Sequence, residues 1–88
     1  MLEARNGRDN DMTLKYIMIN ESIPIIFPET MPHESIKVEH GLITSAGFIQ
    51  LYERDNAIQA KVYGRSHGLR LDSHPEDTVF IEIMLGLT

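Results

Sequence analysis

The sequence predicts an α+β fold: an antiparallel sheet of four to five strands with a C-terminal α-helix packed on one face. Two observations predict it. Short runs of β-branched and aromatic residues, separated by turn residues, fill much of the chain between residues 14 and 71. Residues 73–87 instead repeat apolar residues at three- and four-residue spacing, which is typical of a helix. Strands followed by a single helix indicate the α+β class.

The length of 88 residues allows one small domain. Residues 1–11 (MLEARNGRDND) have no apolar period, so we expect a flexible N-terminal arm or leader there. Residues 12–88 are then the folded domain. A domain of this size buries a limited share of its surface, and oligomerisation is a common remedy.

Four segments are predicted to be strands of the sheet. Residues 14–20 are apolar on both faces, as in a central strand. Residues 24–28 have a proline at each end, which restricts them to an edge, and the turn residues before them suggest a hairpin. Residues 43–52 and 57–64 form a second hairpin through the turn residues 53–56.

Residues 32–40 have two readings. They form a short helix if Pro32 lies near its start and Gly41 is its stop. Residues 36–38 could equally form a strand. We favour the short helix.

Two further features refine the sheet. Residues 69–71 are a candidate for a fifth strand before the helix. Ser45, Ala46 and Gly47 are small enough for another element to pack closely, and Gly47 is a candidate for a β-bulge.

The C-terminal helix has a predicted start and a predicted buried face. Ser73 and Glu76 have the spacing of a capping box, and Pro75 suits the first turn. The expected buried residues are Val79, Phe80, Ile83, Met84 and Leu87. Ile81 and Leu85 extend the apolar character beyond that face, so we expect them to form an interaction surface for a second copy or another protein. Burial within the monomer is an equal alternative for these two residues.

Several short stretches resemble small bacterial and phage-encoded proteins of unknown function. The matching stretches are residues 15–20, the PIIF of residues 24–27, the TSAGF of residues 44–48, and the helix start SHPED of residues 73–77. The resemblance covers roughly residues 14–87. It implies a phage or mobile-element origin, and it implies no activity, substrate or catalytic residue.

Metal or catalytic chemistry has few candidates. His67, Asp72, His74 and Asp77 could converge on one metal ion only if the loop folds over the helix start. The chain has no cysteine, no HExxH pair and no nucleophile elbow. We therefore expect no cofactor, no metal and no enzymatic activity.

A locally basic region surrounds the second hairpin, and Tyr52 and Tyr63 lie in it. Its candidate nucleic-acid contacts are Arg54, Lys61, Arg65 and Arg70. Aromatic residues on a basic sheet can stack bases. The formal net charge of −5 argues against general affinity for phosphate backbones, so we do not expect nucleic acid as a partner.

These observations favour a small non-enzymatic protein-interaction module that self-associates. Two alternatives stay open: a metal-assisted or nucleic-acid-processing enzyme, and a plain nucleic-acid binder that uses the basic hairpin. No apolar run approaches the roughly 20 residues of a membrane helix, and the N-terminus lacks the apolar segment of a signal peptide. We expect no membrane partner and a cytoplasmic location.

Overall fold

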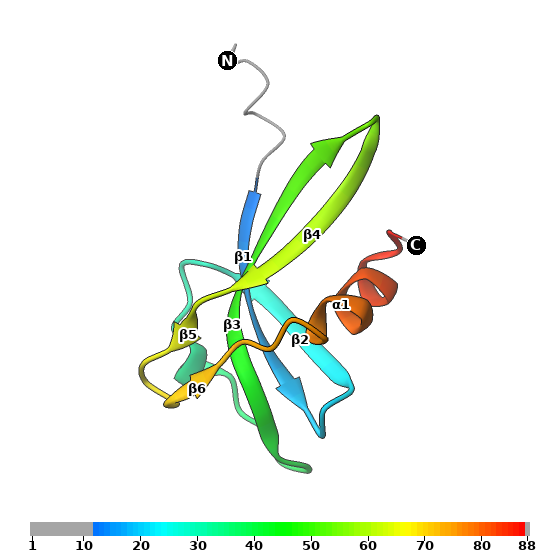
Figure 1. Ribbon diagram of the computed structural model, residues 1–88. Helices are drawn as coiled ribbons and strands as arrows, with labels where there is room; N and C mark the ends of the chain where they lie inside the picture. The colour runs from blue at the N-terminus through cyan, green and yellow to red at the C-terminus, as the bar shows by residue number, and fades with distance from the viewer. Residues whose placement is uncertain (1–11, 88) are drawn as a thin grey trace.

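The computed structural model describes residues 12–87 and has a four-stranded antiparallel sheet, a two-stranded sheet and one α-helix (Figure 1). The predicted α+β class is confirmed. The predicted arm at residues 1–11 and residue 88 lie outside the described residues.

The main sheet contains β1 (Met12–Ile19), β2 (Ile23–Pro28), β3 (Ile43–Arg54) and β4 (Ala57–Tyr63). Its order is β2-β1-β3-β4, and all neighbours are antiparallel. The apolar strand β1 is central, as its two apolar faces predict. The proline-flanked strand β2 lies at an edge, as expected.

Both predicted hairpins form, and their turns explain the polar residues between the strands. Asn20 and Glu21 have positive φ angles of 52° and 65° in the turn between β1 and β2. Asp55 and Asn56 have φ angles of 55° and 64° in the two-residue loop between β3 and β4. Positive φ at both positions is typical of the type I′ turn, which matches the twist of paired strands.

The short helix expected at residues 32–40 does not form. Only the 3₁₀ turn η2 (His33–Ser35) forms, and the chain is extended again at Ile36, where φ is −84° and ψ is 121°. Ile36 and Val38 both pack against buried residues of the sheet. Their spacing of two residues suits an extended segment and does not suit a helix.

The fifth strand is also shorter than expected and does not join the main sheet. The second sheet pairs β5 (Arg65–Ser66) with β6 (Leu71–Asp72). Residues 69 and 70 belong to the turn between them, where Arg70 has a φ of 58° and the Leu69 N–H donates to Ser66 Oγ. The side chain of Ser66 thus replaces the pairing that a longer strand would have made.

The helix α1 (Asp77–Leu85) begins without the expected capping box. Ser73 Oγ instead donates to the carbonyl of Gly64 at 2.9 Å, and the N-cap residue Glu76 makes no side-chain capping bond. The carboxylate of Asp77 accepts the N–H of His74 at 3.2 Å and satisfies a backbone donor just before the helix. Gly86, at φ 73°, ends the helix in the left-handed conformation.

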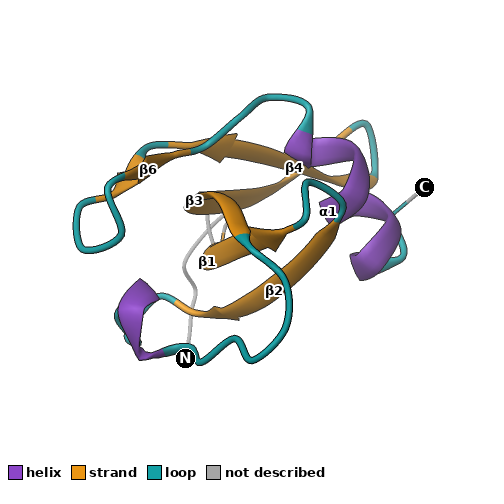
Figure 2. Cartoon of the chain, turned by 90° about the horizontal axis from the view of Figure 1, so that it is seen from below, coloured by secondary structure: helices purple, strands orange, loops and turns teal. Residues whose placement is uncertain are grey.

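Apolar residues are buried on both faces of the main sheet, which explains why β1 is apolar throughout. Figure 2 shows α1 on one side of the sheet and η2 and β6 on the other. The buried residues on the α1 side are Tyr16, Met18, Ile49, Ala60 and Ile81. The buried residues on the other side are Ile17, Ile19, Phe27 and Ala46. The helix covers one face of the sheet, as predicted, and residues of the loops pack on the other face.

The small residues of β3 allow close packing, but the bulge is not at Gly47. The register between β1 and β3 shifts so that Met18 pairs with Ser45 and Ile19 pairs with Ile43, which leaves Thr44 as the extra residue. The segment that leads from β6 to α1 passes close to Gly47 at Ser73. A Cβ atom at Gly47 would be 2.7 Å from the Cβ of Ser73, so glycine permits this crossing.

Candidate functional site

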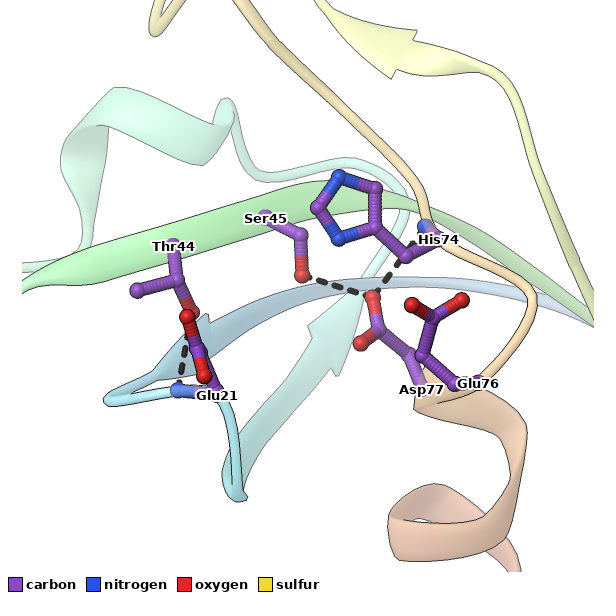
Figure 3. A pocket seen from close by; sticks show the side chains of 6 residues that line it. All are labelled: Glu21, Thr44, Ser45, His74, Glu76 and Asp77. Carbon is purple, nitrogen blue, oxygen red and sulfur yellow. Dashed lines mark hydrogen bonds between the residues drawn. The ribbon is translucent and has the colours of Figure 1, made fainter.

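A pocket of about 290 Å³ lies at the start of α1, beside the bulge of β3 (Figure 3). Its lining residues are Glu21, Thr44, Ser45, His74, Glu76 and Asp77. Three of these six side chains are carboxylates. They come from the β1–β2 turn and from the helix start, two segments that are far apart in the sequence.

Asp77 is the buried centre of this pocket. Its Oδ2 atom accepts the hydroxyls of Tyr16 and Ser45, each at 2.6 Å, and the backbone N–H of His74. The positive end of the helix dipole also favours a carboxylate at this place. Asp77 thus joins β1, β3 and α1, and its hydrogen bonds indicate a structural role.

The pKa of Tyr16 is raised well above its ordinary value. Burial of the phenol is the main cause, and the hydrogen bond to Asp77 and the negative charge of Asp77 act in the same direction. A phenol that ionises only at such high pH stays a hydrogen-bond donor at neutral pH. Tyr16 therefore holds Asp77 in place and is not available as a proton acceptor.

The predicted metal candidates do not form one site. His74 and Asp77 lie at the pocket, whereas His67 is exposed in the turn of the second sheet and Asp72 pairs with Arg65 at 3.5 Å. Within residues 12–87, no group of three or more His, Cys, Asp or Glu side chains is placed to hold a metal ion. The loop before α1 is held away from the helix start by two hydrogen bonds. The Leu69 N–H donates to Ser66 Oγ, and the Ser73 hydroxyl donates to the carbonyl of Gly64.

The structure corrects the interaction surface that the sequence predicts at Ile81 and Leu85 of α1. Ile81 is fully buried and Leu85 is partly buried against the core, as in the alternative of burial within the monomer. Val79, Ile83 and Met84 are 56%, 61% and 56% exposed. The helix is therefore turned so that most of the expected buried face lies outside. Because α1 is apolar on most sides, its periodicity alone does not define which face contacts the sheet.

The four basic candidates separate into two groups. Arg65 pairs with Asp72, and Arg70 is in the turn between β5 and β6. Arg54 and Lys61 extend from the main sheet, on strands β3 and β4, and both are exposed. Of the four candidates, only Arg54 and Lys61 lie on the same strands as Tyr52 and Tyr63.

The sequence did not predict the burial of His33, which is only 5% exposed. Its Nε2 lies 2.8 Å from the carbonyl of Gly47, and its ring contacts Phe27 and Phe48 edge-on at centroid distances of 5.6 and 5.5 Å. Histidine next to Pro32 gives no periodic signal of burial, so only the register of the distant strand β3 could have located this contact.

Comparisons of the chain with protein-family models, with curated proteins and with solved structures find no match. In the part of the chain that the structure describes, no helix is long and apolar enough to cross a membrane.

Proposed function

We propose that the protein is a small, non-enzymatic interaction module that associates with a second copy of itself through the outer face of α1. The exposure of Val79, Ile83 and Met84, each more than half accessible, carries this proposal. A surface helix usually has polar or charged residues on the side away from the core. Large apolar side chains gathered there are typical of a contact surface.

The charge of the helix supports a second copy as the partner. The only charged residues of α1 are Asp77, which is buried, and Glu82, which is partly buried. The chain as a whole has a net charge of −5, so most of its surface would repel another copy. The uncharged face of α1 can meet the same face of a second copy, in the self-complementary arrangement of a two-fold dimer.

The size and composition of the chain are consistent with this role. A domain of 88 residues has a small core, and association adds buried apolar surface to it. Met84 suits such a contact because its flexible thioether adapts to irregular surfaces. The resemblance to small phage-encoded proteins supports a phage or mobile-element origin, and the lack of cysteine fits a reducing compartment such as the cytoplasm.

Sedimentation equilibrium of the full chain over a wide concentration range tests the proposal. We expect a mass that rises from 10.0 kDa toward twice that value. Ile83→Glu is expected to keep the protein monomeric, because the contact would bury an unpaired carboxylate.

Leu42→Glu is the matched control. Leu42 is 72% exposed and lies in the loop that leads into β3, outside α1. We expect this variant to associate like the wild type, and circular dichroism should show that both variants are folded. A wild-type chain that stays at 10.0 kDa at the highest concentration would refute self-association.

A further inference from the structure

One end of the sheet face opposite α1 carries aromatic and basic side chains, several of which are exposed. We call it the aromatic–basic face and define it by six residues: Lys15, Phe48, Tyr52, Arg54, Lys61 and Tyr63. These residues come from β1, β3 and β4, the three adjacent strands at the β4 side of the sheet.

The strand register places all six side chains on the same face. Lys15 pairs with Phe48 across β1 and β3, and Phe48 pairs with Tyr63 across β3 and β4. Directly paired residues project to the same side, and residues two apart on one strand do so as well. Tyr52 and Arg54 therefore follow Phe48 on this face, and Lys61 precedes Tyr63 on it.

The loops that cover this side of the sheet pack on its other end. Ile36, Val38 and Leu71 pack against the cluster that contains Ile17 and Ala46. Beyond that cluster, the side chains are accessible. Arg54 and Lys61 are exposed, Tyr63 is 39% exposed, and Tyr52 is half-buried.

The aromatic part of the face is held in a fixed arrangement. The rings of Phe48 and Tyr63 stack at a centroid distance of 5.5 Å with an interplanar angle of 24°. The edge contact of His33 supports Phe48 from the covered end. Lys15 Nζ lies 5.8 Å from the centre of the Phe48 ring and donates to the carbonyl of Met31 at 2.9 Å. A ligand would therefore meet an ordered platform, which lowers the entropy that binding must overcome.

The charge on this face differs from that of the whole molecule. The only acidic residue in β1, β2, β3 and β4 is Glu53, and it pairs with Ile58 on the opposite face. Three cations therefore share the aromatic–basic face with no carboxylate from these strands. The ion pair of Arg65 with Asp72 lies outside this face. The net charge of −5 thus comes from other parts of the chain.

We propose that the aromatic–basic face binds single-stranded nucleic acid. Bases stack on Tyr63 and Tyr52, and Lys61, Arg54 and Lys15 contact the phosphates. The combination of flat aromatic surface and cations suits unpaired bases, whose faces are free. A duplex hides those faces, and an acidic peptide would use the cations and leave the aromatic rings without partners. The proposal is independent of self-association, because α1 lies on the other side of the sheet.

Fluorescence anisotropy with a labelled oligo-dT and a labelled oligo-U, measured on the full 88-residue chain at several salt concentrations, tests the proposal. We expect saturable binding that weakens with salt. Lys61→Gln should weaken binding and make the salt slope shallower by about 0.7, the value for one lost phosphate contact on a single strand. Tyr63→Leu should weaken binding about tenfold while leaving the salt slope unchanged, because it removes a stacking surface and no charge.

Lys37→Gln is the matched control, since Lys37 is an exposed lysine in the segment between η2 and β3. We expect it to bind like the wild type. A competition series with duplex DNA and poly-glutamate identifies the class of ligand, and thermal melts show that each variant is folded. The proposal is overturned if neither oligomer binds, if duplex or poly-glutamate competes as well as the single strand, or if Lys37→Gln weakens binding as much as Lys61→Gln.

Discussion

The Tyr16 hydroxyl donates a hydrogen bond of 2.6 Å to Asp77 Oδ2, across 61 positions of the sequence. Tyr16 is fully buried in the central strand, and Asp77 is the first residue of the helix. Ser45 donates to the same oxygen from β3. This contact determines where α1 meets the sheet, since the apolar residues of the helix would allow several orientations.

Tyr16→Phe is expected to destabilise the fold by about 1.5–3 kcal/mol, the range for a hydrogen bond to a charged group. The ring still fills its place in the core, so the loss reports the bond to Asp77. Urea unfolding at neutral pH measures it. Tyr52→Phe is the control, because the Tyr52 hydroxyl bonds to Gln59 Oε1 at 3.1 Å in a half-exposed position and should contribute less than about 1 kcal/mol. Equal losses in the two variants would contradict a special role for the buried bond.

Alkaline pH should weaken the fold through Tyr16. The folded-state pKa of Tyr16 is raised by burial and by Asp77, whereas an unfolded tyrosine titrates near a pKa of about 10. The unfolded state therefore loses its proton first. The stability that the protonated phenol contributes to the fold is complete below a pH of about 10. It is lost as the pH rises from there toward the folded-state pKa, by up to about 1.4 kcal/mol per pH unit for one group.

Urea midpoints from pH 8 to pH 11 give the test. The quantity to compare is the difference in free energy of unfolding between the wild type and Tyr16→Phe, because this difference isolates the contribution of Tyr16. We expect this difference to shrink as the pH rises above about 10. A difference that stays constant over the range would show that Tyr16 ionises equally in both states.

The strands were predictable because their signals are local. Prolines at 24 and 28 restrict β2 to the edge. The polar residues 53–56 predict a tight turn, which the structure narrows to Asp55 and Asn56. The apolar run of β1 predicts a central strand. Each of these features depends on neighbours within a few positions, and each is confirmed.

The features that could not be predicted depend on contacts between distant residues. The orientation of α1 follows from the bond between Asp77 and Tyr16, and the burial of His33 follows from its contact with Gly47. The alignment of Lys15 with Phe48 requires the register between β1 and β3. Residue spacing carries no information about such pairs, so sequence reasoning chose the wrong face of α1 and overlooked Lys15.

Gly47→Ala should destabilise the fold by about 1–3 kcal/mol, as overpacking of a core does. The new Cβ would lie 2.7 Å from Ser73 Cβ and 2.8 Å from the carbonyl oxygen of Tyr63. Gly86→Ala is the comparison, since its Cβ would meet no atom within 4 Å but its φ of 73° disfavours alanine by about 1 kcal/mol. Thermal and urea unfolding measure both variants. If Gly47→Ala were neutral, the crossing near Ser73 would be looser than the structure shows.

The orientation of α1 determines how strongly a substitution in this helix should affect the free energy of unfolding. Ile81 is fully buried and Ile83 is 61% exposed, so the same substitution two residues apart should have very different effects. Ile81→Ala is expected to cost about 2–5 kcal/mol, because it leaves a cavity against Tyr16 and Ile49. Ile83→Ala is expected to change the free energy of unfolding of the monomer by no more than about 0.5 kcal/mol. Urea unfolding at a concentration low enough to keep the protein monomeric separates this effect from any loss of association. Equal losses at the two positions, or a larger loss at Ile83, would mean that the helix packs on the sheet through its other face, and the interaction surface proposed for α1 would have to be abandoned.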